Sequence, residues 1–344
     1  MNPYIENILE QPTVLRRLVK AFSKQNLAPI RSALREGRYD RIILTGMGAS
    51  YSAGYPVQLA LSGLGLPVML VNSAELVHYG LDLIGPHSLV WMNSQSGRSA
   101  ELVHLMDKLQ SASTGCVLAC VNDTDSPLAQ GADICLPIHA GPEATVGTKT
   151  YLNTVAASML AAAVLTKNNP DEVRDQLLKT AEGIEVYLKG IEDHKAELDD
   201  LLGEFNNLIL LGRGPSMGAV WTGALITKES TKFQLEGMNA AEFRHGPLEL
   251  VEPGFTALLF AGAPTTRELN RKLALDIKKF GGRVLWIDDA EDAEIDTVMM
   301  PSGTGWARSL VEMLPVEILT LVLADRQGVT AGAFRHVTKV TVEE

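Results

Sequence analysis

The sequence contains little cysteine, with three residues in a chain of 344. They are Cys116, Cys120 and Cys135, which lie in or near apolar segments and leave an odd number. A disulfide framework is excluded as the basis of the fold, because such frameworks belong to short, cysteine-rich chains. We expect reduced thiols in a core and a reducing, cytoplasmic compartment.

The sequence also lacks a hydrophobic run long enough to cross a bilayer. The longest apolar helical stretch, residues 155–165, is far shorter than the ~20 residues that a spanning helix needs. The first 25 residues mix charged and apolar positions at helical spacing, so we expect no signal peptide there. No membrane partner is predicted.

Basic residues are fewer than acidic residues. There are 30 Lys and Arg residues against 41 Asp and Glu residues, a formal net charge of -11. This field repels polyanions, so no nucleic-acid partner is expected, although backbone amides and helix ends can still hold a small anion. The seven histidines are dispersed and do not pair with cysteines at ligand spacing, so we expect no metal and no cofactor.

What the sequence does contain is an alternation of short β-favouring runs with helical patterns. This alternation is typical of parallel α/β sheets. The predicted strands fall in two series, one at residues 41–44, 67–71, 88–92 and 116–120, the other at residues 208–211, 256–260 and 284–287. Residues 171–205 are charged, have helical periodicity and are predicted to bridge the two series.

The two series match each other, which indicates a duplication. Gly46-Met-Gly48-Ala-Ser50 resembles Gly212-Arg-Gly214-Pro-Ser216, and 214 minus 48 is 166. The segment from Asn72 to His78 resembles the segment from Asn239 to His245, and 245 minus 78 is 167. Several features in one order at nearly one offset predict a protein of two structural repeats.

The glycine turn at Gly46 and Gly48 follows a predicted strand and precedes a helical pattern, where a doubly wound sheet presents amides to an anion. A dinucleotide is disfavoured, because Tyr51 stands where the third glycine of G-x-G-x-x-G belongs. The same pattern also occurs in ordinary strand-to-helix turns. No P-loop sequence is present, which argues against a nucleotide triphosphatase.

A second polar turn, residues 94–99, reads Ser-Gln-Ser-Gly-Arg-Ser at an expected helix start. Its hydroxyls and amides, together with the helix dipole, suit a phosphate. The alternative is an ordinary turn in which Ser serves as helix cap. The equivalent residues 261–266 of the second repeat read Ala-Gly-Ala-Pro-Thr-Thr, so the fold does not require the serines. We therefore favour a phosphate site in the first repeat.

These motifs, in their order, resemble the sugar isomerase (SIS) family, and within it the isomerase domain of glucosamine-6-phosphate synthases. The motifs are residues 46–51, 94–97, 146–149, 211–214, 228–229, 242–247 and 339–341. The resemblance implies an α/β fold of two duplicated SIS domains, each a parallel sheet flanked by helices in a flavodoxin-like, three-layer αβα arrangement. The expected divisions are an N-terminal helical segment at 1–36, SIS domains at 37–168 and 206–330, linking helices at 169–205 and a tail at 331–344.

The resemblance also implies roles for individual residues. Glu229 matches a proton-shuttling carboxylate, His245 a ring-opening histidine, and Lys339 a lysine that forms a Schiff base with the open-chain sugar. A homodimer is implied, with His245 reaching the site of the neighbouring subunit. The residues expected to hold a phosphorylated sugar are Gly48, Ser50, Ser94, Gln95, Ser96, Ser99 and Thr148.

Each catalytic assignment has a structural alternative. Glu229 could be a solvated helix residue paired with Lys228 or Lys232. His245 could cap a turn, since the repeat has His78 at the same place. Lys339 could face solvent from a terminal strand instead of serving, in a closing tail, as a nucleophile.

Two departures from the family pattern bear on the expected activity. The chain has no cysteine before Cys116, so it lacks the glutamine-hydrolysing nucleophile of the synthases, and Ile226 replaces a family lysine. We expect a phosphosugar isomerase or aminosugar-phosphate deaminase acting on a hexose or hexosamine 6-phosphate. The favoured version converts glucosamine 6-phosphate to fructose 6-phosphate and ammonia. Fructosamine-6-phosphate deglycation and non-catalytic sugar-phosphate sensing are the alternatives.

Overall fold

The computed structural model describes residues 2–111, 114–166, 168–303 and 305–341. It divides into two compact units, each built around one sheet. The first unit comprises residues 10–179 and the tail from residue 336, and the second comprises residues 180–335 and those before residue 10. The boundary falls inside helix α9 (Pro170–Lys189).

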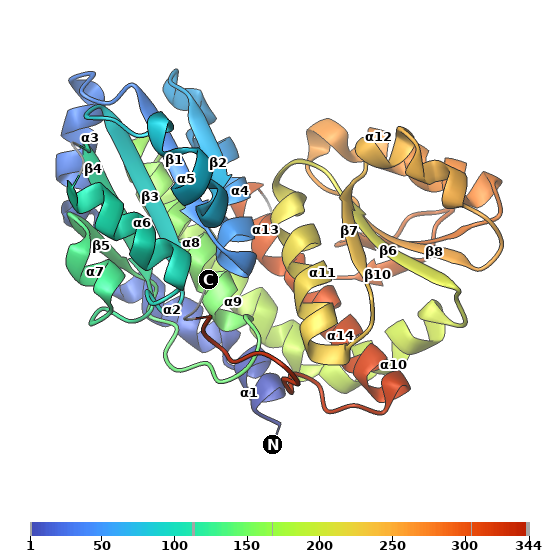
Figure 1. Cartoon of the computed structure of the whole chain (residues 1–344). Coiled ribbons are helices and arrows are strands. Elements are labelled where there is room, and N and C mark those ends of the chain that lie inside the picture. Colours follow the sequence, from blue (N-terminus) through green and yellow to red (C-terminus); the bar gives the residue numbers. More distant parts are fainter. Residues whose placement is uncertain (1, 112–113, 167, 304, 342–344) are drawn as a thin grey trace. The chain divides into compact units, whose positions relative to one another are not determined.

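The sheet of the first unit has five parallel strands in the order β2-β1-β3-β4-β5. They are β1 (Arg41–Gly46), β2 (Val68–Asn72), β3 (Ser88–Ser94), β4 (Cys116–Val121) and β5 (Ile134–Pro137). Two of the inner strands, β3 and β4, are buried at every position, as expected for a parallel sheet covered on both faces (Figure 1).

Helices cover both faces of this sheet. They are α2 (Gln11–Ala21), α3 (Ala28–Arg35), α4 (Gly48–Leu61), α5 (Ser73–Tyr79), α6 (Ala100–Ser111), α7 (Pro127–Gly131) and α8 (Lys149–Leu165), with 3-10 turns η1 (Lys24–Leu27), η2 (Ser62–Leu64) and η3 (Leu81–Leu83). Helix α8 is buried along its whole length because α2, α4 and β4 all pack on it. Residues 155–165 of α8 are accordingly almost entirely apolar, and the buried Asn153 nearer its start donates to the carbonyls of Val14 and Ile138.

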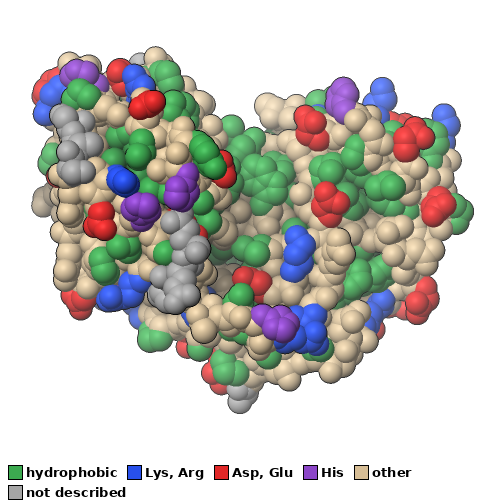
Figure 2. Space-filling model, in the orientation of Figure 1, with side chains coloured by type: hydrophobic (Ala, Val, Ile, Leu, Met, Phe, Trp, Pro, Cys, Tyr) green, Lys and Arg blue, Asp and Glu red, His purple; other side chains and the backbone are tan. Residues whose placement is uncertain are grey.

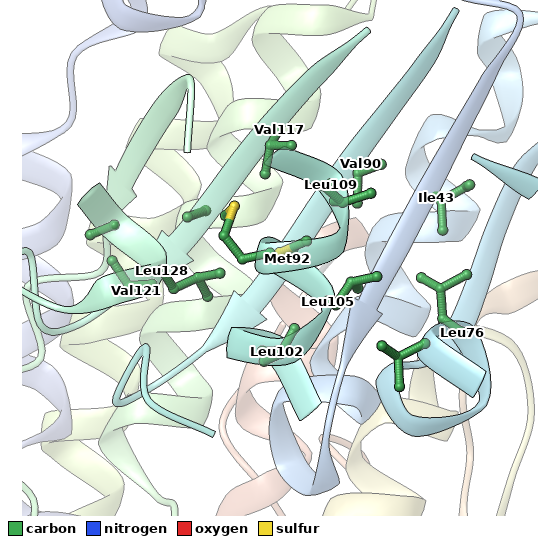
Figure 3. Close-up of a cluster of buried hydrophobic side chains, with 14 residues drawn as sticks. Ile43, Leu76, Val90, Met92, Leu102, Leu105, Leu109, Val117, Val121 and Leu128 are labelled. Carbon is green, nitrogen blue, oxygen red and sulfur yellow. The ribbon is translucent and has the colours of Figure 1, made fainter. Parts of the chain in front are cut away.

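The face opposite α8 is covered by α5, α6 and α7, which pack side chains against the strands (Figure 3). Val90 and Met92 of β3 and Val117 of β4 point toward Leu105 and Leu109 of α6. Burial of this apolar surface, at ~25 cal/mol per Å², holds helix α6 on the sheet. The start of α6 is thereby fixed just beyond the end of β3.

The second unit repeats this design, with parallel strands in the order β10-β9-β8-β6-β7. Its strands are β6 (Asn207–Gly212), β7 (Glu236–Asn239), β8 (Phe255–Phe260), β9 (Arg283–Asp288) and β10 (Thr297–Met299). Its helices are α1 (Pro3–Leu9), α10 (Ile191–Leu202), α11 (Met217–Thr231), α12 (Pro264–Lys279), α13 (Arg308–Val311) and α14 (Met313–Gln327), with 3-10 turns η4 (Gly214–Ser216), η5 (Glu242–Arg244), η6 (Pro247–Leu250) and η7 (Gly305–Ala307).

The duplication predicted from the sequence is confirmed. Read from the opposite edge, the second sheet has the topology of the first, with β6 in the place of β1 and β8 in the place of β3. The side chains of Asn72 and Asn239 both accept a hydrogen bond from the backbone two residues on, at 3.0 and 2.7 Å. Gly48 and Gly214 both have positive φ, 53° and 56°. The α/β fold class is therefore confirmed.

Three further predictions can be compared with the structure. Cys116, Cys120 and Cys135 are free thiols, the first two buried and the third half-buried. Across the part of the chain that the structure describes, none of the helices has the length and apolar character to cross a membrane. The face shown in Figure 2 carries interspersed acidic and basic side chains, without a broad basic area.

Candidate functional site

The ends of β1 and β3 form the switch point of the first sheet. These neighbouring strands are followed by connections that leave in opposite directions, β1 toward β2 and β3 toward β4. In open α/β sheets, ligands bind outside the carboxyl ends of strands at such a point. The two polar turns singled out in the sequence, residues 46–50 and 94–99, both lie there.

The turn after β1 is shaped by its glycines. A Cβ on Gly46 would lie only 3.0 Å from the carbonyl oxygen of Asn93, so the end of β1 can approach β3 only without a side chain. Gly48 begins α4 with φ of 53°. Ser50, in the first turn of α4, is half-buried, and its carbonyl accepts a hydrogen bond from the side-chain Nδ2 of Asn93 at 3.3 Å.

The turn after β3, which we call the serine loop (residues 94–99), is held by its own hydroxyls. The Oγ of Ser94 accepts from the Gly97 amide at 3.0 Å, and the Oγ of Ser96 accepts from the Arg98 amide at 3.1 Å. Each hydroxyl keeps its own proton for donation. The loop ends at Ser99, whose carbonyl accepts from the amides of Val103 and Leu102, in the first turn of α6, at 3.0 and 3.1 Å.

The serine loop is also fixed from the side of β4. The carbonyl of Gln95 accepts from the Asn122 amide at 3.1 Å, and Arg98 forms an ion pair with Asp123 at 2.9 Å. Gly97 has φ of 62°, and a Cβ there would lie 2.0 Å from the Oγ of Ser126. Only glycine fits, so the loop has one preorganised conformation beside the N-terminus of α6.

A buried carboxylate that sequence reasoning missed, Glu143, lies in the loop before α8. Its side chain is 0% exposed. One oxygen accepts from the Thr148 amide, the Thr148 hydroxyl and the Thr150 amide at 3.0, 3.1 and 3.2 Å, and the other accepts from the Thr150 hydroxyl at 2.5 Å. These bonds fix the backbone around Thr148, one of the residues predicted to contact substrate.

Glu143 also holds Lys339. The Nζ of Lys339 donates to Glu143 Oε2 at 2.7 Å and to the carbonyl of Thr145, and the lysine side chain is 22% exposed. The tail makes a second contact, in which the carbonyl of Thr341 accepts from the Ala100 amide at 3.2 Å, next to the serine loop. The structure thus brings Lys339, Thr148 and the start of α6 together within the first unit. A terminal strand is not formed at Lys339.

The other two predicted catalytic residues belong to the second unit. Glu229 is half-buried on α11, and the Nζ of Lys232 donates to its backbone carbonyl. Burial and the nearby Arg335 lower the pKa of Lys232, while Glu229 opposes that shift. His245 is exposed after η5, and its amide donates to the carbonyl of Glu242 at 2.8 Å.

Ile226, which stands where the family pattern has lysine, is fully buried. It lies three residues before Glu229 on the same helix. An apolar side chain in this position packs in the core and offers no charge to a sugar. Across residues 2–111, 114–166, 168–303 and 305–341, no group of three or more His, Cys, Asp or Glu side chains could hold a metal ion.

Two duplicated, doubly wound sheets, with a hydroxyl-rich loop at the switch point of one of them, define an α/β protein of two structural repeats. The SIS domain model matches residues 38–166 and 201–298. The chain belongs to the SIS domain family.

Among its relatives are the glutamine–fructose-6-phosphate aminotransferases (isomerizing) of Thermococcus kodakarensis and Streptococcus pneumoniae. The first is 31% identical over 98% of this chain and 58% of the relative, and the second is 29% identical over 99% and 59%. The chain therefore spans less than two thirds of the length of these curated relatives.

Solved structures show the same fold. The C-terminal domain of glucosamine-fructose-6-phosphate aminotransferase from Francisella tularensis superposes with a TM-score of 0.85 at 20% identity, covering 96% of this chain and 97% of that one. Glucosamine-6-phosphate deaminase from Thermotoga maritima gives 0.77 at 19% identity, covering 98% and 99%. Tagatose-6-phosphate ketose/aldose isomerase from Escherichia coli gives 0.77 at 21%, covering 96% of each chain.

Proposed function

We propose that the chain is an aminosugar-phosphate deaminase that converts glucosamine 6-phosphate and water to fructose 6-phosphate and ammonia. The observation that carries the proposal is the position of Lys339. An amine that could attack a sugar carbon is tied to Glu143 and Thr145, and its tail contacts the residue that follows the serine loop. The spacing of motifs in the sequence would not by itself indicate that Lys339, near the C-terminal end of the sequence, lies close to the serine loop.

In this proposal the serine loop binds the phosphate. Hydroxyl protons of Ser94, Ser96 and Ser99, backbone amides and the N-terminus of α6 would surround its oxygens, with Ser50, Gln95 and Thr148 contacting the phosphate or sugar. Hydrogen bonds to a charged group contribute about 1.5–3 kcal/mol each. Because the loop is already held in one conformation, little ordering cost opposes binding.

The reaction would proceed through an imine at C2. His245 assists ring opening, and Glu229 moves a proton from C2 to C1 of the open-chain aminosugar, which converts the 2-amino aldose to a 2-imine. The Nζ of Lys339 adds to C2 and ammonia leaves, so that the sugar is held as an imine of the lysine. Water then hydrolyses this imine, releases fructose 6-phosphate and restores the amine.

A homodimer is part of the proposal. His245 is exposed on a turn of the second unit, so it is accessible to a neighbouring copy of the chain. We propose that it completes the site of that copy.

The test is to trap the imine. Sodium borohydride added to the chain during incubation with glucosamine 6-phosphate should reduce the imine and leave a stable adduct, located by peptide mass spectrometry at Lys339. Lys339→Arg should abolish the adduct and lower kcat by at least about a hundredfold. The exposed Lys279→Arg is the matched control and should behave as the unaltered chain. Full turnover of Lys339→Arg would refute the proposal.

Parallel assays distinguish the related activities. Ammonia and ketose are both measured with glucosamine 6-phosphate, fructosamine 6-phosphate and a panel of hexose 6-phosphates. Glu229→Gln should retain phosphosugar binding and lose turnover. Binding without turnover in the unaltered chain, unchanged in Glu229→Gln, would instead indicate a sugar-phosphate sensor. Ammonia release from fructosamine 6-phosphate alone would indicate a deglycase.

A further inference from the structure

Helix α11, which carries Glu229, ends on a lysine with an unusual backbone conformation. The helix ends at Thr231, and the next residue, Lys232, has φ of 63°. Among the described residues, only Lys232 and His139 are non-glycine residues with positive φ. Helix α14 ends on the same φ of 63°, but there the residue is Gly328, which has no Cβ. The backbone disfavours a lysine at this position, which indicates a role for its side chain.

The ammonium group of Lys232 joins two segments of the chain. Its Nζ donates to the backbone carbonyl of Glu229, one turn back on α11, and to the carbonyl of Ala333, near the start of the tail. Burial and the like charge of Arg335 lower the pKa of Lys232, so the ammonium is held there against an electrostatic cost. Lys232 thus ties the end of α11, where Glu229 lies, to the tail.

The start of the tail, residues 331–333, which we call the tail root, is docked on the second unit. The amide of its glycine donates to the carbonyl of Ser230 at 3.4 Å. The side-chain Nδ2 of Asn2 donates to the carbonyl of Ala331 at 3.0 Å. Together with the contact of Lys232, each of the three residues of the tail root is therefore held by a hydrogen bond.

The tail tip, residues 339–341, is held in the first unit, where Lys339 is bonded to Glu143 at 2.7 Å. The chain passes from the second unit to the first between residues 335 and 336. The connecting residues 335–338 are exposed. The position of the tail tip therefore depends on the two points at which the tail is held.

The length of free chain before the tail tip sets an entropic cost. Six positions separate Ala333 from Lys339, since 339 minus 333 is 6. If the tail root were released, the free segment would extend back to the end of α14 at Gln327, and 339 minus 327 is 12. Doubling the length of a free segment lowers the effective concentration of its end at a fixed point about threefold.

We propose that Lys232 is a positioning residue for the tail. By holding the tail root to the end of α11, it keeps the free segment short and raises the effective concentration of Lys339 at Glu143, beside the serine loop. Lys232 contacts no reacting atom. Its effect on the rate rests on the proposed function, whereas its anchoring of the tail does not depend on the reaction.

Substitutions separate the backbone role of Lys232 from the role of its side chain. Lys232→Gly adopts positive φ without strain and removes the ammonium. Lys232→Asn tolerates the same φ with a side chain too short to reach Ala333. Lys232→Arg keeps the charge and the donors. If Lys232 only terminated α11, Lys232→Gly would equal or exceed the unaltered chain in every assay.

The first measurement is hydrogen–deuterium exchange on the full chain, read by mass spectrometry. The amide of Gly332 donates within the docked root, and the amide of Ala100 donates to the carbonyl of Thr341. Both amides should exchange about threefold faster in Lys232→Gly and Lys232→Asn, and at the unaltered rate in Lys232→Arg. The control is Lys279→Ala, which removes an exposed lysine at the end of α12 and should leave both rates unchanged. Unchanged exchange in Lys232→Gly would overturn the inference.

The second measurement is the initial rate at which the borohydride adduct forms at Lys339 with glucosamine 6-phosphate, expressed per folded molecule. It should fall about threefold in Lys232→Gly and Lys232→Asn and be retained in Lys232→Arg. KM should stay unchanged, because the serine loop is intact. Faster exchange of the tail with an unaltered rate of adduct formation would overturn the positioning role. If the unaltered chain forms no adduct and releases no ammonia, the proposed function fails, and the exchange measurement alone decides whether Lys232 holds the tail.

Discussion

Five donors meet the two oxygens of Glu143, from Thr148, Thr150 and Lys339. A carboxylate is the only side chain of this size that accepts at both ends. In Glu143→Gln one carboxylate oxygen is replaced by an amide NH2 group, which donates hydrogen bonds. This group would lie against a hydroxyl or the lysine ammonium, both of which need an acceptor. The two loops that Glu143 joins would then separate.

Glu143→Gln is expected to lower kcat/KM about tenfold or more, because loss of one charged hydrogen-bond pair costs roughly 1.5–3 kcal/mol. The yield of borohydride adduct at Lys339 should fall in parallel. When the yield is expressed per folded molecule, a variant that is only less stable would show no such decrease. Glu182→Gln removes an exposed carboxylate and serves as control. Unchanged adduct yield would contradict a role in positioning Lys339.

The titration of the buried Glu312 carboxyl predicts how the stability of the protein depends on pH. The pKa of Glu312 is raised from 4.5 to about 7, chiefly by burial and to a smaller extent by Asp288, against the lowering effects of Arg308 and Ser216. The folded state therefore holds this proton more tightly than the unfolded state. Stability from this group is present below pH 4.5 and is lost as the pH rises toward 7.

Glu312→Gln removes the titration and keeps the shape. The stability of the variant minus that of the unaltered chain should increase from pH 5 to pH 8, by up to about 3 kcal/mol at 1.36 kcal/mol per pKa unit. Arg308 and Asp288, which face Glu312, keep their charges over this range, so they cancel in the difference. Denaturant titrations at several pH values measure this difference in the free energy of unfolding. The prediction would be contradicted if the free energies of the two chains changed with pH in the same way.

At the scale of elements, the sequence predicted the inner strands and the edge strand β2, and missed the other edge strands. Three strands were missed, namely β5, β7 and β10, and each lies at an edge of its sheet. Their sequences, Ile-Cys-Leu-Pro, Glu-Gly-Met-Asn and Thr-Val-Met, are shorter than the apolar runs that mark a strand buried on both faces. Edge strands need less burial, so periodicity detects them poorly.

In the loops, features that depend on neighbouring residues were predicted from the sequence, and features that depend on distant residues were missed. The serine loop was predicted because its hydroxyls, its glycine and the following helix lie within a few residues of one another. Glu143 was missed because an acidic residue in a loop is ordinarily solvated, and one of its partners, Lys339, is 196 residues away in the sequence. No local pattern distinguishes a carboxylate that is buried by such a contact.

At the scale of the whole molecule, the proposed dimer predicts that activity requires residues from two chains. If His245 completes the site of a neighbouring copy, then Lys339 and His245 of one active site come from different chains. A chain with His245→Ala and a chain with Lys339→Arg are each expected to be inactive as homodimers. A mixed dimer would have one site in which both residues are intact and one in which both are altered.

Mixing the two inactive chains in equal amounts, with exchange of subunits, should therefore restore activity. Half of the dimers would be mixed and each would have one working site of two, so about 25% of the unaltered activity is expected for a symmetric dimer. Activity measured before and after subunit exchange checks this, with light scattering to follow the dimer. A dimer that exchanges subunits without regaining activity would show that His245 acts within its own chain or not at all.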